Sequence, residues 1–226
     1  MNKTIMWIGQ GLLFVLMALV IIGAFLYAPL AKGLGEFTRV LYFHVPMAWI
    51  TVIAFFVGAY YSVMYLRKRE IIYDYYAEAI NQLGIIFCLL ATVTGAMWAK
   101  VSWGAYWNWD PRQTSIFILL LIYGAYFSLR SAIEQEDKRA RLSAVYSLLA
   151  FVTVPFFVFI IPRLYETLHP DPIINAESKI NMNGEMLLVF LTSLGAFTIV
   201  FFWMAHLKKS IIQLNIKLKK LVDKEN

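Results

Sequence analysis

Tryptophan and tyrosine gather in one short segment of the sequence, between Trp98 and Trp109. Five of these twelve residues are Trp or Tyr, whereas the 16% aromatic content of the whole chain predicts about two. Trp and Tyr favour the headgroup level of a bilayer, so an aromatic belt is one interpretation. A belt supplies one or two such residues at a span end and does not predict four tryptophans in one loop. The cluster therefore favours a binding surface for a flat, apolar, polarisable ligand.

Histidine is the second residue type that could do chemistry, and the chain has three: His44, His169 and His206. A lone histidine is most often a polar surface residue. Imidazole nitrogen is also a common axial ligand of heme iron. His44 and His169 lie on either side of the aromatic segment in the sequence and are candidates for such a pair. His206 lies among lysines and is interpreted as a cation at a helix C-terminus.

Asp110, Pro111 and Gln113 have the spacing of a helix start, with Asp110 as the N-cap and Pro111 at the first helical position. This capping role is the structural interpretation of Asp110, and a functional carboxylate is the alternative. Arg112 is harder to explain by capping, because a cation at a helix N-terminus opposes the macrodipole. It either extends to the outer headgroups or binds an anionic ligand group through two hydrogen bonds.

Several motifs of catalysis and covalent attachment are missing from the sequence. There is no Gly-x-x-x-x-Gly-Lys-Ser/Thr, so this chain supplies no P-loop ATP hydrolysis of its own. There is also no His-Glu-x-x-His, no Gly-x-Ser-x-Gly and no Cys-x-x-Cys-His, and Cys88 is the single cysteine. The sequence therefore predicts a protein that is not an enzyme and that carries no covalently attached heme.

The residues that could do chemistry must be positioned by membrane helices. The chain is 61% hydrophobic and 15% charged, against roughly half and a quarter in soluble proteins. A bilayer crossing takes ~20 apolar residues. Six segments qualify, which predicts an all-α integral membrane protein with six transmembrane helices, at about 5–28, 46–66, 80–99, 111–130, 142–161 and 184–205.

Prolines and flanking residues refine these spans. Pro46 suits the first helical position of the second span, and Pro155 is expected to kink the fifth. The first span is expected to be retained, because no small-residue cleavage site follows it. None of the expected spans has a charged residue near its centre, where such a residue would indicate a proton or ion pathway.

Basic residues set the orientation of the spans. One set of loops and tails holds 14 of the 20 Lys and Arg residues, and the opposite set holds the other six, which are Lys32, Arg39, Lys100, Arg112, Arg163 and Lys179. Positive charge concentrates on the cytoplasmic side. Both termini are therefore expected in the cytoplasm, with loops at about 29–45, 100–110 and 162–183 facing out. The aromatic segment, His44 and His169 then share the outer face, and the net charge of +6 requires no nucleic acid.

The chain divides into a six-span membrane domain, residues 1–206, and a basic amphipathic cytoplasmic tail, residues 207–226. In the tail, Ile211, Leu214, Leu218 and Leu221 recur at helical spacing with lysines between them. A helix of this composition lies on or projects from the inner membrane surface. The alternative is a helix that docks a partner.

The segment Trp103-Gly-Ala-Tyr-Trp-Asn-Trp-Asp-Pro-Arg112 resembles the tryptophan-rich WWD signature, WGxxWxWDxR, of the heme-handling membrane proteins of cytochrome c biogenesis. Within that group the chain is similar to the heme exporter protein C (CcmC) family, whose length and six spans it shares. His44 matches the first outer loop of that family and His169 the third. Tyr106 stands where many members have Trp, and residues 111–113 combine CcmC-like and CcsA-like features.

The resemblance implies that heme b is held without a covalent bond by a WWD loop, at about residues 98–114, on the outer (periplasmic) face. His44 and His169 are the implied axial ligands of the iron. The tryptophans of the WWD motif are the implied apolar wall, and two arginines are candidates for binding the heme propionates. Besides the two histidines, the implied heme-site residues are Trp103, Trp107, Trp109, Asp110, Arg112 and Arg39.

The resemblance also implies partners and a location. Heme would be delivered to the heme chaperone CcmE, with CcmA, CcmB and CcmD as complex subunits, in the cell inner membrane. A CcsA-like heme-handling subunit and a small-solute permease are the alternatives. A permease usually has broken helices or polar residues at mid-membrane, and that signal is weak here. A transmembrane electron-transfer cytochrome would place histidine pairs within the spans, whereas both histidines are expected at one edge.

Overall fold

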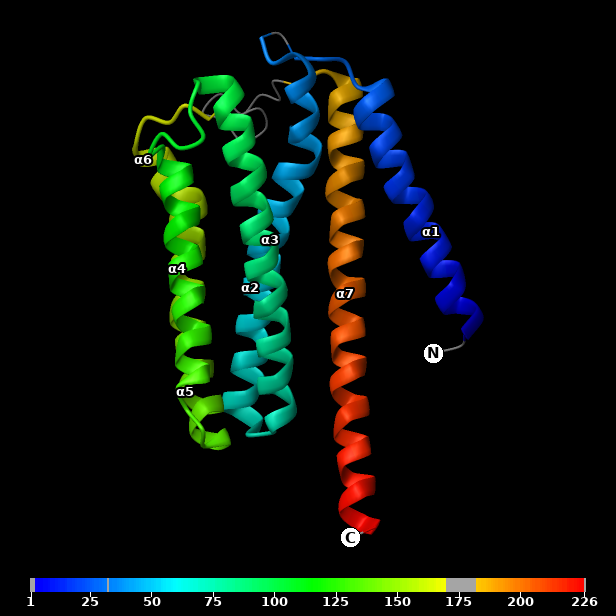
Figure 1. Cartoon of the computed structure of the whole chain (residues 1–226), viewed down its shortest axis with the longest axis vertical. Coiled ribbons are helices and arrows are strands. Elements are labelled where there is room, and N and C mark those ends of the chain that lie inside the picture. The colour runs from blue at the N-terminus through cyan, green and yellow to red at the C-terminus, as the bar shows by residue number, and fades with distance from the viewer. Residues whose placement is uncertain (1–2, 32, 170–181, 226) are drawn as a thin grey trace.

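The computed structural model describes residues 3–31, 33–169 and 182–225, and all its regular elements in these ranges are helical. The helices stand side by side as one bundle (Figure 1). Six of them are long and apolar enough to cross a membrane. The expected all-α fold with six spans is therefore confirmed.

The first half of the bundle begins with α1, which passes into a π-helical turn, η1. A 3-10 helix, η2, leads directly into α2, and α3 returns antiparallel to it. The second half consists of α4, of α5 with a π-helical turn, η3, and a short helix, α6, and of the long α7. The bounds are α1 Lys3–Ile22, η1 Gly23–Tyr27, η2 Gly35–Val40, α2 Leu41–Lys68, α3 Ile71–Trp103, α4 Pro111–Ser131, α5 Glu136–Pro155, η3 Phe156–Ile160, α6 Ile161–Leu164 and α7 Gly184–Glu225.

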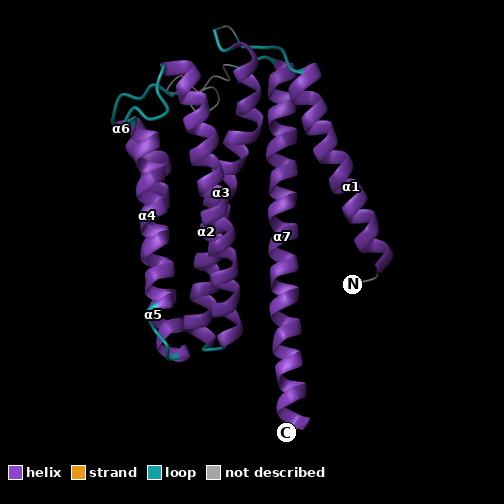
Figure 2. Cartoon of the chain, in the orientation of Figure 1, coloured by secondary structure: helices purple, strands orange, loops and turns teal. Residues whose placement is uncertain are grey.

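The two ends of the bundle differ in their connections. At one end, short turns join α2 to α3 and α4 to α5, and Arg69 makes the first of these turns in the left-handed conformation, with φ 60°. The longer loops gather at the opposite end (Figure 2). Their described residues belong to the three loops that the charge pattern predicts on one face, and the orientation of that face in the membrane stays a prediction. We call this end the loop end.

Helix α2 is the central element, since it packs against α3, α5 and α7. Its side chains Ile50 and Ala54 are fully buried, together with Ile80 of α3 and Phe201 of α7. Burying apolar side chains between helices in this way holds the register of α2 against α3. That register matters because α2 and α3 each carry residues of the site described below.

The expected start of the second span at Pro46 was wrong. Helix α2 begins at Leu41 and is preceded by η2, so Pro46 lies inside it. A proline has no N–H to donate to the carbonyl four residues earlier, here that of Tyr42. The hydroxyl of Ser193 on α7 donates to that carbonyl instead. This bond explains how the helix tolerates Pro46. Because α2 begins at Leu41, His44 lies within a helix rather than in a loop before it.

The fifth span is interrupted where proline predicts it. The regular α-helix ends at Pro155, and the π-helical turn Phe156–Ile160 follows. At the end opposite the loop end, α3 begins at Ile71, well before the expected 80. This longer α3 buries an ion cluster, in which Arg130 of α4 binds Asp74 at 2.7 Å and Glu78 at 2.8 Å.

Candidate functional site

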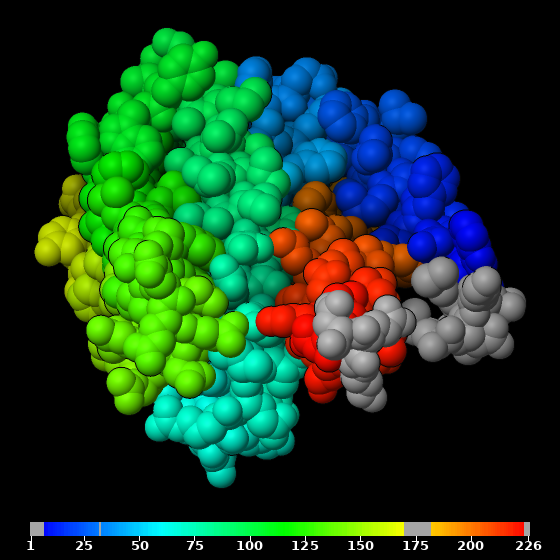
Figure 3. Space-filling view, turned by 60° about the horizontal axis from the view of Figure 1, so that its bottom comes forward, coloured from blue at the N-terminus to red at the C-terminus, as the bar shows by residue number. Residues whose placement is uncertain are grey.

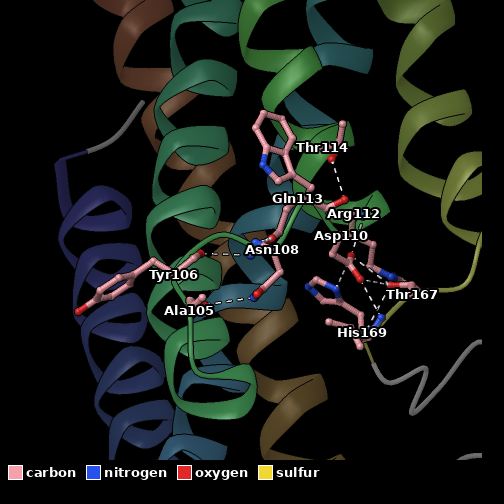
Figure 4. A network of polar contacts seen from close by, with 11 residues as sticks. Ala105, Tyr106, Asn108, Asp110, Arg112, Gln113, Thr114, Thr167 and His169 are labelled. Atoms are coloured by element: carbon pink, nitrogen blue, oxygen red, sulfur yellow. Dashed lines mark hydrogen bonds and ion pairs between the residues drawn. The ribbon is translucent and has the colours of Figure 1, made fainter.

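The carboxylate of Asp110 connects two loops at the loop end (Figure 4). Its Oδ1 accepts the backbone N–H of Arg112 at 2.9 Å, which is the predicted N-cap bond of α4. The same oxygen lies 2.8 Å from Nδ1 of His169. Its Oδ2 accepts the Thr167 hydroxyl at 2.8 Å and the Leu168 N–H at 2.7 Å. Asp110 therefore both caps a helix and anchors the His169 loop.

These contacts keep Asp110 charged. Burial alone raises the pKa of a carboxyl, and Asp110 is only 4% exposed. The hydrogen bonds from the Leu168 and Arg112 N–H groups and the Thr167 hydroxyl, with the charge of His169, outweigh that effect and lower the pKa of Asp110 below its ordinary value. At neutral pH the side chain is an acceptor on both oxygens.

This carboxylate makes Nδ1 of His169 a donor. An ionised carboxylate can only accept, so Nδ1 must carry a proton. The ring also packs against two tryptophans, whose own rings meet edge-on with 5.1 Å between centroids. Trp98 stacks on it with 5.9 Å between ring centroids, and Trp103 meets it edge-on at 4.7 Å.

Nδ1 of His44 contacts a different group. It lies 3.1 Å from Oγ1 of Thr94 on α3. The Thr94 hydroxyl donates its one proton to the carbonyl of Leu90 at 2.7 Å. Thr94 is therefore the acceptor for Nδ1 of His44.

The imidazole of His44 fits against a glycine of α3. A Cβ added to Gly95 would lie 2.8 Å from Cε1 of His44, closer than such contacts allow. Trp98, which stacks on His169, follows Gly95 by one helical turn. The fold thus brings the two predicted ligands to one region at the loop end.

The tryptophans divide into two groups. Trp103, with Trp98, contacts His169. Trp107 packs edge-on against Trp109 at 5.8 Å and against Phe117 of α4 at 6.0 Å. Trp109 has a left-handed backbone, with φ 55°, and is 71% exposed. A bulky residue seldom adopts this conformation, which indicates that the fold holds the indole at the surface.

The two predicted propionate partners have different surroundings. Arg39 of η2 forms an ion pair with Glu36, donates to the carbonyl of Ala24 at 2.6 Å and lies over the ring of Phe25. These contacts connect η2 to η1. Arg112 lies in the first turn of α4, beside Asp110. The propionate role stays a prediction for both arginines.

Gln113 differs from its expected part in a capping box. Its Oε1 accepts the N–H of Asn108 at 2.9 Å, and its Nε2 donates to the carbonyl of Tyr106 at 3.3 Å (Figure 4). Gln113 therefore braces the preceding loop instead of returning to the N–H of Asp110. This bracing holds the WWD loop against the start of α4.

The sequence did not predict four residues of the site. Thr94 and Gly95 position His44, Thr167 shares the Asp110 carboxylate, and Trp98 stacks on His169. Trp98 had a signal in the aromatic segment. The other three have none, because a threonine or glycine near a span end is common and its partner lies far away in the sequence.

The fold and the site define a multi-span helical membrane protein with a histidine and tryptophan site at one end. A model of the heme exporter protein C family, CcmC, matches residues 1–222. The chain belongs to this family, and the resemblance drawn from residues 103–112 is confirmed. The match also favours the CcmC family over a CcsA-like protein, the two alternatives that residues 111–113 leave open.

Curated relatives carry the same family name. The chain is similar to heme exporter protein C of Bradyrhizobium diazoefficiens, with 30% identity over 167 residues, 74% of this chain and 63% of the relative. It is 35% identical to that of Rhodobacter capsulatus over 132 residues, 58% of this chain and 54% of the relative. For Escherichia coli K12 the identity is 30% over 151 residues, 66% and 60% of the two chains. The matches thus span less than two thirds of each relative.

Proposed function

We propose that this protein binds heme b without a covalent bond at the loop end and hands it on during cytochrome c maturation. The observation that carries the proposal is the matched state of two histidines. His44 and His169 each have Nδ1 in contact with a side-chain oxygen, of Thr94 at 3.1 Å and of Asp110 at 2.8 Å. Histidines that bind a metal almost always hold their other ring nitrogen in such a hydrogen bond, which fixes the orientation of the ring.

The surroundings of the two histidines suit heme better than a bare metal ion. Within the described ranges, no group of three or more His, Cys, Asp or Glu side chains could hold a metal ion. Heme iron already has four nitrogen ligands from the macrocycle, so two axial histidines complete its coordination. Trp98 and Trp103 beside His169 offer apolar faces to a flat ring. In this proposal Trp107, Trp109, Arg112 and Arg39 complete the heme site, the arginines toward the propionates.

The two axial ligands would be unequal. His169 donates to a charged carboxylate, whereas His44 donates to a neutral hydroxyl. A hydrogen bond to a carboxylate raises the basicity of a ligating histidine. His169 is therefore the stronger donor to iron, and Asp110 is the residue that makes it so. Asp110 acts as a positioning residue in addition to capping α4.

Delivery requires an exposed part of the site. Trp109 and Tyr106 are the most exposed aromatic residues of the WWD loop. We propose that the chaperone CcmE docks on this part, with CcmA, CcmB and CcmD as complex subunits. The proposed location is the inner membrane, with the loop end in the periplasm and both termini in the cytoplasm. On this proposal the protein transports heme and catalyses no reaction.

A visible absorption spectrum of the purified protein tests heme binding. We expect a low-spin spectrum typical of two histidine ligands. His44→Ala and His169→Ala should each shift it toward high spin or lose the heme, while His206→Ala, a histidine at the other end of the bundle, should not. If both outer variants keep the original spectrum, the ligands lie elsewhere.

Reporter fusions test the proposed orientation separately. Fusions after Lys68 and Lys138 should report the cytoplasm, and fusions near Gly104 and Asp171 the outside; Asp171 lies outside the described residues. A cytoplasmic signal at Gly104 would contradict the proposed face of the site.

A further inference from the structure

The end of α7 far from the heme site carries an apolar stripe. Leu207, Ile211, Leu214, Leu218 and Leu221 are each between 44% and 58% exposed. Their spacing of four, three, four and three residues is the heptad pattern of a two-helix coiled-coil seam, in which the first and fourth positions of each heptad face a partner. A single heptad seam of this kind is complete only when a second helix covers it.

Most of this stripe lies beyond the lipid. Helix α7 has 42 residues, which is about 63 Å at 1.5 Å per residue, whereas the hydrocarbon core is about 30 Å thick. Lys208 and Lys209 mark the boundary. Past them, α7 continues without a break and projects beyond the turns of the other helices (Figures 1 and 3).

Three hydrogen bonds hold the start of this part against α2 and α3, in line with its span. Lys208 Nζ donates to Oε1 of Gln82 at 2.8 Å, Lys209 Nζ to the hydroxyl of Tyr61 at 2.8 Å, and Gln213 Nε2 to that of Tyr76 at 2.7 Å. The helix therefore does not bend onto the membrane surface, and its stripe faces water. An exposed apolar surface of this kind marks an interaction site.

The charges beside the stripe select the partner. In the heptad register, Lys208 and Lys217 occupy the two positions that flank the seam, one on each side. Lys208 turns toward Gln82 of α3, whereas Lys217 is exposed beside the seam. The only acidic residue between residues 206 and 223 is Asp223, which the register places away from the seam. A second copy of this chain would therefore bring no complementary charge. We infer that the stripe docks an amphipathic helix of another protein, with an apolar seam flanked by Asp or Glu.

The preformed helix makes such docking favourable. A short isolated helix is marginal in water, because nucleation is costly. Here the membrane part of α7 already holds the receptor helix in place, so binding must order only the partner. The inference is independent of heme, since the stripe lies at the end of the bundle opposite His44 and His169.

Two designed peptides of three heptads test the inference on the full chain in nanodiscs of neutral lipid. Both have the same leucine seam, one with Glu and one with Lys at the flanking positions. Fluorescence anisotropy should show binding of the Glu peptide, weakened by salt, and at least roughly tenfold weaker binding of the Lys peptide. Equal binding of the two peptides, or of neither, would overturn the inference.

Variants locate the binding on the stripe. The double change Leu214→Ala with Leu218→Ala keeps the helix but removes apolar contact. It should weaken binding of the Glu peptide by at least about tenfold. Lys217→Glu should also weaken binding of the Glu peptide, while Lys220→Glu, the same change one turn away and farther from the seam, should weaken it less. Circular dichroism confirms that each variant folds. Two other results would overturn the inference. Cross-linking of two copies through the stripe would assign the surface to a second copy. Binding of anionic vesicles without peptide, if it needs Leu214 and Leu218, would assign the surface to lipid.

Discussion

Replacing Asp110 by Asn separates its two roles. Asn caps a helix about as well as Asp, so the bond from the Arg112 N–H can remain and α4 should keep its start. The carboxylate, however, accepts from both sides, from His169 Nδ1 on one oxygen and from the Leu168 N–H on the other. An amide has only one acceptor oxygen. One of these two donors must therefore lose its partner.

Either outcome weakens the iron ligand. If the amide oxygen stays with His169, the Leu168 N–H meets an amide NH₂, and the loop that carries the histidine is released. If the amide turns, its NH₂ faces both Nδ1 of His169 and the N–H of Arg112, so the N-cap bond is lost too. The NH₂ then favours the histidine tautomer with the proton on Nε2, and that nitrogen cannot bind iron. A hydrogen bond to a charged group contributes about 1.5–3 kcal/mol, and loss of such a partner typically costs 10–100-fold in metal affinity.

We therefore expect Asp110→Asn to bind heme about 10–100-fold more weakly. The assay is a heme titration followed by absorbance in the purified protein, with the unfolding temperature measured alongside. Asp223→Asn, at the far end of α7, removes the same charge and should change neither quantity. Heme affinity in Asp110→Asn equal to that of the original protein would refute the positioning role and leave Asp110 a helix cap.

Three further predictions follow from the same geometry. Gly95→Ala should displace the imidazole beside it and lower heme binding, whereas Gly195→Ala, with no atom within 4 Å of the new Cβ, should not; equal heme content in both would contradict the contact. Arg130→Met leaves Asp74 buried without its partner and should destabilise the protein by about 3–5 kcal/mol in detergent unfolding, and an unchanged midpoint would count against that ion pair. Because the pKa of Asp110 is lowered on folding, its stabilisation is present above the ordinary Asp pKa and is lost as pH falls through the lowered value. The unfolding temperature should therefore fall less steeply with decreasing pH in Asp110→Asn than in the original protein. Identical curves of unfolding temperature against pH for the two proteins would contradict this prediction.

Local sequence features predicted the membrane architecture correctly. Six apolar runs predicted six spans, because bilayer crossing depends on the length and hydropathy of one segment. The Asp110-Pro111 pair predicted the N-cap of α4, because capping involves only neighbouring residues. The motif of residues 103–112 predicted the family for a similar reason, since it is contiguous in the chain.

Helix boundaries were less predictable where a distant residue decides them. Pro46 would begin an isolated helix, yet α2 starts earlier because Ser193 of α7 satisfies the carbonyl that the proline leaves open. Hydropathy also cannot show that α3 extends to Ile71, since its first turns are polar and are stabilised by the ion cluster around Arg130.

The sequence by itself determined which residue types were available for the site, namely two histidines and a tryptophan-rich loop. Only the tertiary structure decided how these histidines are held. His44 meets Thr94 50 residues away, and His169 meets Asp110 59 residues away. Such bonds depend on the register of packed helices and on where two loops converge. The hydrogen-bond partner of Nδ1 in each histidine is therefore a property of the folded bundle.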